Sequence, residues 1–151
     1  NEIKKALLLK NKFSESSNAK FFIVSQFCFD PETILNWSIK INSEGNKIPI
    51  IIGLPGVAKL STLIKYSLSC GIGNSINFLK KQGSNVINLV KNQEPNQLVK
   101  KLANSTEILK KNGIEGIHIY PLGGLRKSSE WAYAVMDGKF NITENGFRVN
   151  Y

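Results

Sequence analysis

Apolar and polar residues alternate along this chain in blocks that predict strands and helices in turn. The clearest block is the apolar run 21–27, rich in aromatic and β-branched residues and soon followed by Asp30 and Pro31. Aspartate is a strong helix N-cap, and proline suits the first helical position because an N–H there would lack a partner. We therefore predict a strand over 21–27, a short turn and a helix over 31–41. We expect this strand to be covered on both faces.

The rest of the chain continues the same pattern. Apolar runs predict two more strands, at 48–52 and 116–121. Helical periodicity, bounded by glycine, proline and asparagine, predicts helices elsewhere, while 83–93 stays ambiguous. These helices are expected at 3–13, 57–69, 74–82, 95–111 and 127–136. Residues 138–151 follow an Asp-Gly turn and are expected to form a polar C-terminal tail.

Strands that alternate with helices indicate an α/β fold with parallel strands joined by right-handed crossovers. Three such strands would leave both edges of an open sheet exposed. A complete eight-fold barrel typically needs about 250 residues, whereas this chain has 151. The pattern therefore favours the last three strand–helix units of a TIM-type (β/α)8 barrel that is incomplete in this chain. Residues 1–137 would form the C-terminal part of that one barrel domain, with 138–151 as the tail.

Composition narrows the classes of function. The net charge is +9, but only Arg126 and Arg148 are arginines and the lysines are scattered. Nucleic-acid-binding surfaces are usually clustered and interleaved with arginine or aromatic residues, so we expect no nucleic-acid partner. No apolar stretch approaches the roughly 20 residues of a membrane span, and no signal peptide is visible. We expect a cytoplasmic protein with no membrane partner. The chain begins with Asn1 rather than Met, which leaves open that it is a piece of a longer protein.

Few residues offer direct chemistry. Cys28 and Cys70 lie in apolar sequence without CxxC spacing or a histidine cluster, so we expect buried free thiols and no metal site. His118 is the only histidine and lies within a predicted strand. The leading interpretation is a hydrogen-bonded core histidine, with a catalytic base as the alternative. No partner for it and no convincing pair of acids is identifiable, so catalytic residues stay unassigned.

Unusual residues stand where each predicted strand ends. Gln26 ends the first strand, Gly53–Gly56 follow the second, and Tyr120–Gly124 close the third. The carboxyl ends of parallel strands meet on one rim of a barrel, where active sites are built. A large amide is costly to bury there without partners, so Gln26 is the first candidate functional residue. The glycines would let backbone and ligand approach closely, or would serve as ordinary turns.

Several segments resemble the methylenetetrahydrofolate reductase family. The segment IVSQFCFDPETILNW (23–37) is similar to a family segment in which the pattern ITQ precedes two or three aromatic residues and an aspartate. Segments 48–67 and 113–132 resemble the family's next and last strand–helix units, and LLLKNKF (7–13) resembles the helix before the glutamine strand. The resemblance runs from Leu7 to Trp131, and the glutamine segment is its most specific motif.

The resemblance implies an eight-stranded barrel that holds FAD. NAD(P)H would reduce the flavin, and hydride would pass between the flavin and the 5,10-methylene-/5-methyl-tetrahydrofolate pair in one-carbon metabolism. Gln26 would hydrogen-bond the pterin of the folate, and Tyr120 and Leu122 would pack against the ligand. Lys12 falls where a lysine reaches the FAD phosphates. The substrate-binding residues implied in this way are Gln26, Leu60, Tyr120, Leu122, Gly124 and Arg126.

Some positions depart from the family pattern. Leu60 stands where the family often has an aromatic residue that stacks on the folate side chain. Gly124 occupies the place of an arginine that helps to hold the folate, and we take Arg126 as the candidate replacement for that charge. These departures indicate a divergent branch, whose reaction direction and choice between NADH and NADPH stay open.

Other parts of the family pattern have no counterpart in this chain. The family's general acid, a glutamate on the first strand, and its Arg-Gly-Asp segment are absent. The resemblance thus implies the folate-side fragment of a flavin-dependent, folate-linked oxidoreductase, inactive alone, with either a homo-oligomer or an N-terminal half-barrel as its protein partner. Two alternatives stay open, namely a non-catalytic folate-binding half-barrel and a flavin-free methyltransferase barrel.

Overall fold

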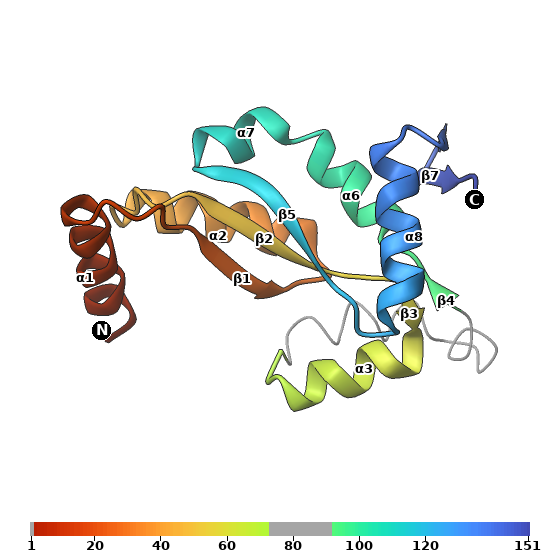
Figure 1. Ribbon diagram of the computed structural model, residues 1–151, viewed down its shortest axis with the longest axis horizontal. Coiled ribbons are helices and arrows are strands. Elements are labelled where there is room, and N and C mark those ends of the chain that lie inside the picture. Colours follow the sequence, from red (N-terminus) through yellow and green to blue (C-terminus); the bar gives the residue numbers. More distant parts are fainter. Residues whose placement is uncertain (1, 73–91) are drawn as a thin grey trace.

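The computed structural model describes residues 2–72 and 92–151 (Figure 1). Its helices are α1 (Glu2–Ser16), α2 (Pro31–Ser43), α3 (Leu60–Ser69), α6 (Asn96–Ala103), α7 (Thr106–Lys111) and α8 (Leu125–Met136). Its strands are β1 (Ile23–Phe27), β2 (Ile50–Pro55), β3 (Ala58–Lys59), β4 (Asn92–Gln93), β5 (Ile114–Tyr120), β6 (Phe140–Thr143) and β7 (Gly146–Val149). The helix expected at 74–82, and most of the ambiguous segment 83–93, lie outside the described residues.

A small parallel sheet forms the centre of the molecule. Its strand order is β1-β2-β5, and both pairings are parallel. One face of the sheet, including Ile50, Ile52 and Leu54 of β2, packs against apolar residues of α2, α6 and α7. The expected α/β class with three parallel strands is therefore confirmed. The sheet is open in the described part of the chain, with β1 and β5 at its edges.

Local sequence signals explain how α2 begins. The Asp30 carboxylate accepts hydrogen bonds from the Glu32 N–H (3.2 Å) and the Thr33 N–H (3.3 Å). Pro31 takes the first helical position, as the sequence predicted. This cap fixes the turn between β1 and α2, so that Phe29 and Pro31 are buried directly after the carboxyl end of β1.

Several expectations about burial and boundaries were wrong. The predicted strand is not covered on both faces, because Val24 of β1 is 40% exposed and Phe22, which directly precedes β1, is 62% exposed. Cys28 is only partly buried and Cys70 is exposed, since Cys70 follows the last turn of α3. The single helix expected at 95–111 divides into α6 and α7, because residues 104–105 leave the helical pattern.

Residues 140–149 form a β-hairpin that the sequence analysis described only as part of a polar tail. β6 and β7 pair in antiparallel fashion, and Phe147 and Val149 are buried against Trp131 of α8. The Trp131 indole N–H donates to Asn96 Oδ1 (2.7 Å), and Asn96 Nδ2 donates to the Phe147 carbonyl (2.9 Å). The alternating apolar residues around Asn145–Gly146 were the available signal for this hairpin.

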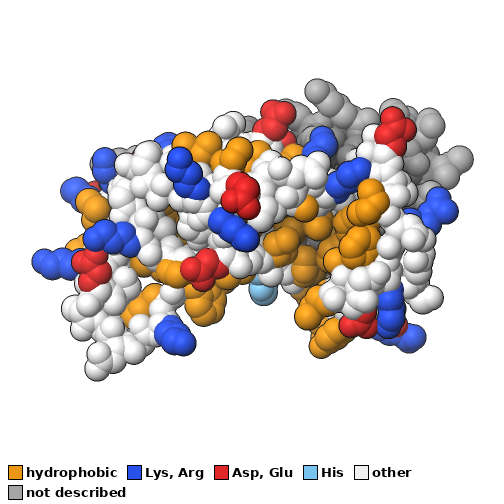
Figure 2. Space-filling model, turned by 90° about the horizontal axis from the view of Figure 1, so that it is seen from above, with side chains coloured by type: hydrophobic (Ala, Val, Ile, Leu, Met, Phe, Trp, Pro, Cys, Tyr) orange, Lys and Arg blue, Asp and Glu red, His pale blue; other side chains and the backbone are white. Residues whose placement is uncertain are grey.

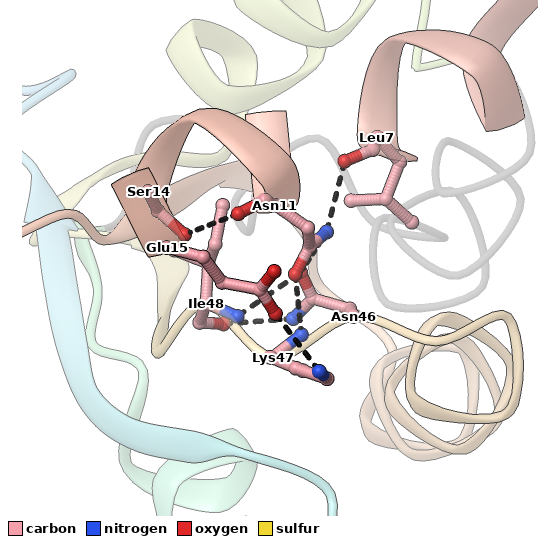
Figure 3. A network of polar contacts seen from close by, with 7 residues as sticks. All are labelled: Leu7, Asn11, Ser14, Glu15, Asn46, Lys47 and Ile48. Carbon is pink, nitrogen blue, oxygen red and sulfur yellow. Dashed lines mark hydrogen bonds and ion pairs between the residues drawn. The ribbon is translucent and has the colours of Figure 1, made fainter. Parts of the chain in front are cut away.

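A buried amide network joins α1 to the loop before β2 (Figure 3). Asn11 Oδ1 accepts from the Lys47 N–H (2.6 Å), and Asn11 Nδ2 donates to Asn46 Oδ1 (3.3 Å) and to the Leu7 carbonyl (2.8 Å). Asn46 Nδ2 in turn donates to the Ile48 carbonyl (2.7 Å). Because both asparagines are buried, these bonds fix α1 at the amino end of the sheet.

Candidate functional site

The candidate site begins with an irregularity in β1. Pairing joins Val24 to Ile51 and Phe27 to Gly53, so three steps along β1 match two steps along β2. The extra residue makes a β-bulge, a feature common beside active sites because it redirects a side chain. Gln26 lies within this bulge, and its orientation therefore depends on the bulge as well as on strand alternation.

Side chains hold the peptide unit that joins Gln26 to Phe27. The Ser25 hydroxyl accepts from the Gly53 N–H of β2 (2.9 Å) and donates to the Gln26 carbonyl (3.0 Å). The Phe27 N–H, at the other side of the same peptide unit, donates to Gln26 Oε1 (3.1 Å). The carbonyl end of the Gln26 side chain is thus tied to its own backbone, and the amide NH₂ group is the part left to donate to a ligand.

Tyr120 crosses β2 and reaches β1 at the same point. Its hydroxyl donates to the Ser25 carbonyl (3.0 Å), and its ring lies 5.5 Å from the ring of Phe27, measured between centroids. Gly53 makes this crossing possible, because a Cβ there would lie 2.5 Å from the Ser25 carbonyl oxygen and 2.7 Å from Tyr120 Cε2. The close approach that the glycine allows is therefore between strands of this protein.

Leu60 and Leu122 join Tyr120 in one apolar cluster. This cluster is built around Phe27, Phe29 and Leu63, with Tyr120 and Leu122 partly buried at its margin. Leu60 is only 1% exposed, so its side chain faces the protein interior. Three of the residues expected near the folate thus lie together at the carboxyl end of the sheet, and two of them retain exposed surface.

A hollow of about 680 Å³ runs along β1. All five β1 residues line it, together with Cys28, and Thr33 and Trp37 of α2 form part of its wall. Its size falls within the range of small-molecule sites. Gln26 is exposed here, so the buried amide that the sequence analysis considered is not what the structure contains. A larger hollow, of about 860 Å³, is lined by α6, by β7 and by residues at the carboxyl ends of β1 and β2, such as Phe29 and Pro55, and it includes none of the residues expected to contact folate or FAD.

His118 is exposed, so the expectation of a core histidine was wrong. It is on β5, an edge strand, and its ring meets the edge of Tyr120 with centroids 4.6 Å apart. Figure 2 shows the histidine side chain at the surface, next to hydrophobic side chains, with Lys and Arg side chains spread along this whole view of the molecule. No group of three or more potential metal ligands occurs among residues 2–72 and 92–151.

Gly124 and Arg126 lie at the start of α8. Gly124 has a φ of +117°, and a Cβ there would meet no neighbour within 4 Å. The Arg126 side chain is 90% exposed and its Nε donates to Glu130 Oε1 at 2.9 Å, a bond that raises the pKa of the guanidinium. The structure therefore places Arg126 in an exposed ion pair along α8, and its partner Glu130 is not one of the other candidate residues.

Lys12 is separated from the other candidates. It is exposed on α1, which is joined to the loop before β2 at the amino end of the sheet, whereas Tyr120 and Leu122 are at the carboxyl end (Figure 1). Lys12, the one residue implied for FAD, thus lies at the opposite end of the sheet from the residues implied for folate.

Ser25, which holds this site together, was not among the residues predicted from the sequence. The available signal was its position next to Gln26, but its partner Gly53 is distant in the sequence.

No described helix is long and apolar enough to cross the lipid bilayer. No protein-family model matches the chain.

Proposed function

We propose that this chain is the folate-side portion of a flavin-dependent, folate-linked oxidoreductase of the methylenetetrahydrofolate reductase type. In this proposal the three-stranded sheet belongs to an α/β barrel whose remaining strands and flavin-holding residues lie in another segment or subunit. The observation that carries the proposal is the position of Gln26. The key residue of the most specific motif stands on a bulge beside a hollow, next to a cluster that includes Tyr120 and Leu122.

The role of this chain in such an enzyme is to bind and orient the folate. The NH₂ group of Gln26 would donate to a carbonyl oxygen or ring nitrogen of the pterin, since its oxygen is held by the Phe27 N–H. The partly buried Tyr120 and Leu122 would supply an apolar wall. A few placed polar groups beside an apolar wall are the usual composition of a small-molecule site.

The uncovered parts of the sheet also support an incomplete barrel. Val24 of β1 and the preceding Phe22 expose apolar surface, and β1 and β5 are edge strands. Natural sheets rarely leave apolar edge strands unprotected, because such edges pair with other chains. Further strands beside β1 and β5 would pair both bare edges, and closure of the sheet into a barrel would cover the exposed face of β1.

An FAD titration, followed by flavin absorbance, tests the proposal. The 151-residue chain would be compared with the full native product of the gene that encodes it. We expect only the full product to hold FAD, and NAD(P)H to bleach the bound flavin. If the full product binds no FAD but binds 5-methyltetrahydrofolate, a flavin-free folate protein replaces the reductase. If it binds neither, the folate proposal is wrong.

A pair of variants tests the site itself. Gln26→Ala in the full product should weaken 5-methyltetrahydrofolate binding by about tenfold, the effect of losing a hydrogen bond of roughly 1.4 kcal/mol. Gln97→Ala is the matched control, because Gln97 is an exposed glutamine on α6. Equal affinities of the two variants would remove Gln26 from the site.

A further inference from the structure

We propose that Ser25 is a positioning residue that orients Gln26 toward the ligand. The inference rests on the proposed function, because it explains how the folate-facing amide is held. Ser25 does not itself contact the folate in this proposal. It acts through the bulge of β1, which it connects to both of the other strands of the sheet.

The contacts of Ser25 form a three-way junction. Its hydroxyl accepts from the Gly53 N–H of β2 (2.9 Å), and its carbonyl accepts from the Tyr120 hydroxyl of β5 (3.0 Å). The same hydroxyl donates to the Gln26 carbonyl (3.0 Å). One serine thus links the bulge to β2, to β5 and to the next peptide unit along β1.

The last of these bonds controls Gln26. The Gln26 carbonyl and the Phe27 N–H belong to one peptide unit, so the bond from Ser25 sets the direction of that N–H. The Phe27 N–H in turn holds Gln26 Oε1 at 3.1 Å. Since this donor requires an acceptor, it also decides which end of the Gln26 amide points outward. Removal of the Ser25 hydroxyl frees the peptide unit to rotate, and the Gln26 side chain loses its fixed orientation.

Replacement of the Ser25 hydroxymethyl group by the methyl group of alanine therefore acts on Gln26 indirectly, through the Gln26–Phe27 peptide unit. If Ser25 only stabilised the fold, its substitution would weaken folate binding whether or not Gln26 is present. If Ser25 orients Gln26, its substitution has no further effect on folate binding once Gln26 has been replaced. The two roles are separated by a double-mutant cycle, in which coupled residues give non-additive free energies.

The experiment measures 5-methyltetrahydrofolate affinity in the full native product. We expect Ser25→Ala to weaken binding by about fivefold to tenfold, and Ser25→Thr, which keeps the hydroxyl, to remain within about twofold of the wild type. The double variant Ser25→Ala/Gln26→Ala should bind no more weakly than Gln26→Ala alone. Independent, multiplying effects of the two substitutions would overturn the inference. The matched control is Ser43→Ala, which removes an exposed hydroxyl that donates to the Lys40 carbonyl.

A second measurement separates this inference from the proposed function. Hydrogen exchange of the Phe27 amide, followed by NMR without ligand, reports directly on the bond to Gln26 Oε1. We expect faster exchange in Ser25→Ala and in Gln26→Ala, and an unchanged rate in Ser43→Ala. An unchanged Phe27 rate in Ser25→Ala would overturn the positioning role even if folate binds. If the Phe27 exchange rates change as expected but Ser25→Ala and Gln26→Ala leave folate affinity unchanged, the result would instead count against the proposed function.

Discussion

The buried asparagine of α1 gives a stability prediction that can be worked out from its contacts. Asn11→Ala removes the acceptor of the Lys47 N–H and the donor to Asn46 Oδ1. A buried polar group without a partner costs about 1–3 kcal/mol, and a lost neutral hydrogen bond about 1 kcal/mol. Alanine returns roughly 0.5 kcal/mol through its higher helix propensity. Asn46 Oδ1 still accepts from the Ile48 N–H (3.4 Å), and Asn46 Nδ2 keeps its bond to the Ile48 carbonyl, which limits the damage. We expect a net loss of about 2 kcal/mol.

The assay is urea unfolding of the same protein form with and without the substitution, followed by circular dichroism. A loss of about 2 kcal/mol in a domain of this size also lowers the melting temperature by roughly 4–8 °C. Asn36→Ala is the control, because Asn36 is an exposed asparagine on α2, and we expect it to be neutral or slightly stabilising. If the free energies of unfolding of Asn11→Ala and Asn36→Ala agree within about 0.5 kcal/mol, the amide network does not hold α1 in place.

Three other perturbations test separate parts of the structure. Gly53→Ala should destabilise the fold by about 3 kcal/mol, because the added methyl meets backbone that cannot move aside. If the variant unfolds at the same urea concentration as the wild type, Tyr120 does not cross β2 at Gly53. Trp131→Phe should cost about 1–2 kcal/mol in thermal unfolding through the lost bond to Asn96, and a variant as stable as the wild type would contradict the role of this bond. Partial burial and the adjacent Glu94 carboxylate raise the pKa of Tyr151. Folding stability should therefore fall as pH rises above about 10, where tyrosine ionises more readily in the unfolded chain than in the folded one. Tyr151→Phe should make this decline of stability with pH less steep. An identical decline in the wild type and the variant would refute the role of Tyr151.

The elements that depend on local chemistry were predictable from the sequence. Asp30 and Pro31 determine the start of α2 with contacts inside one turn, and the isoleucines of β2 are apolar enough to indicate a strand directly. The C-terminal hairpin was missed because its strands are short and its burial depends on Trp131. His118 was misjudged because strand patterning does not show which parts of a sheet face other elements cover, and the His118 side chain is exposed on β5.

Part of the candidate site was likewise predictable from the sequence, and part was not. Gln26 stood out in the sequence because a large amide interrupts an apolar strand. The orientation of its amide depends on the register between β1 and β2, where one extra residue is inserted. The bonds of Ser25 to Gly53 and Tyr120 span distant segments, so only the assembled sheet reveals them. Lys12 was grouped with the site by resemblance, but the attachment of α1 near Asn46 places it at the other end.

The central position of β2 sets the order in which the chain can assemble during synthesis. The ribosome synthesises β1, α2 and β2 one directly after another, so α2 can cover the apolar face of both strands before the rest of the chain is made. The second edge of β2 stays bare until β5 has been translated, because β5 pairs there. An unpaired apolar strand edge invites association with other nascent chains. Slow translation of the segment between β2 and β5 should therefore lower the yield of folded protein, whereas slow translation after β5 should leave it unchanged.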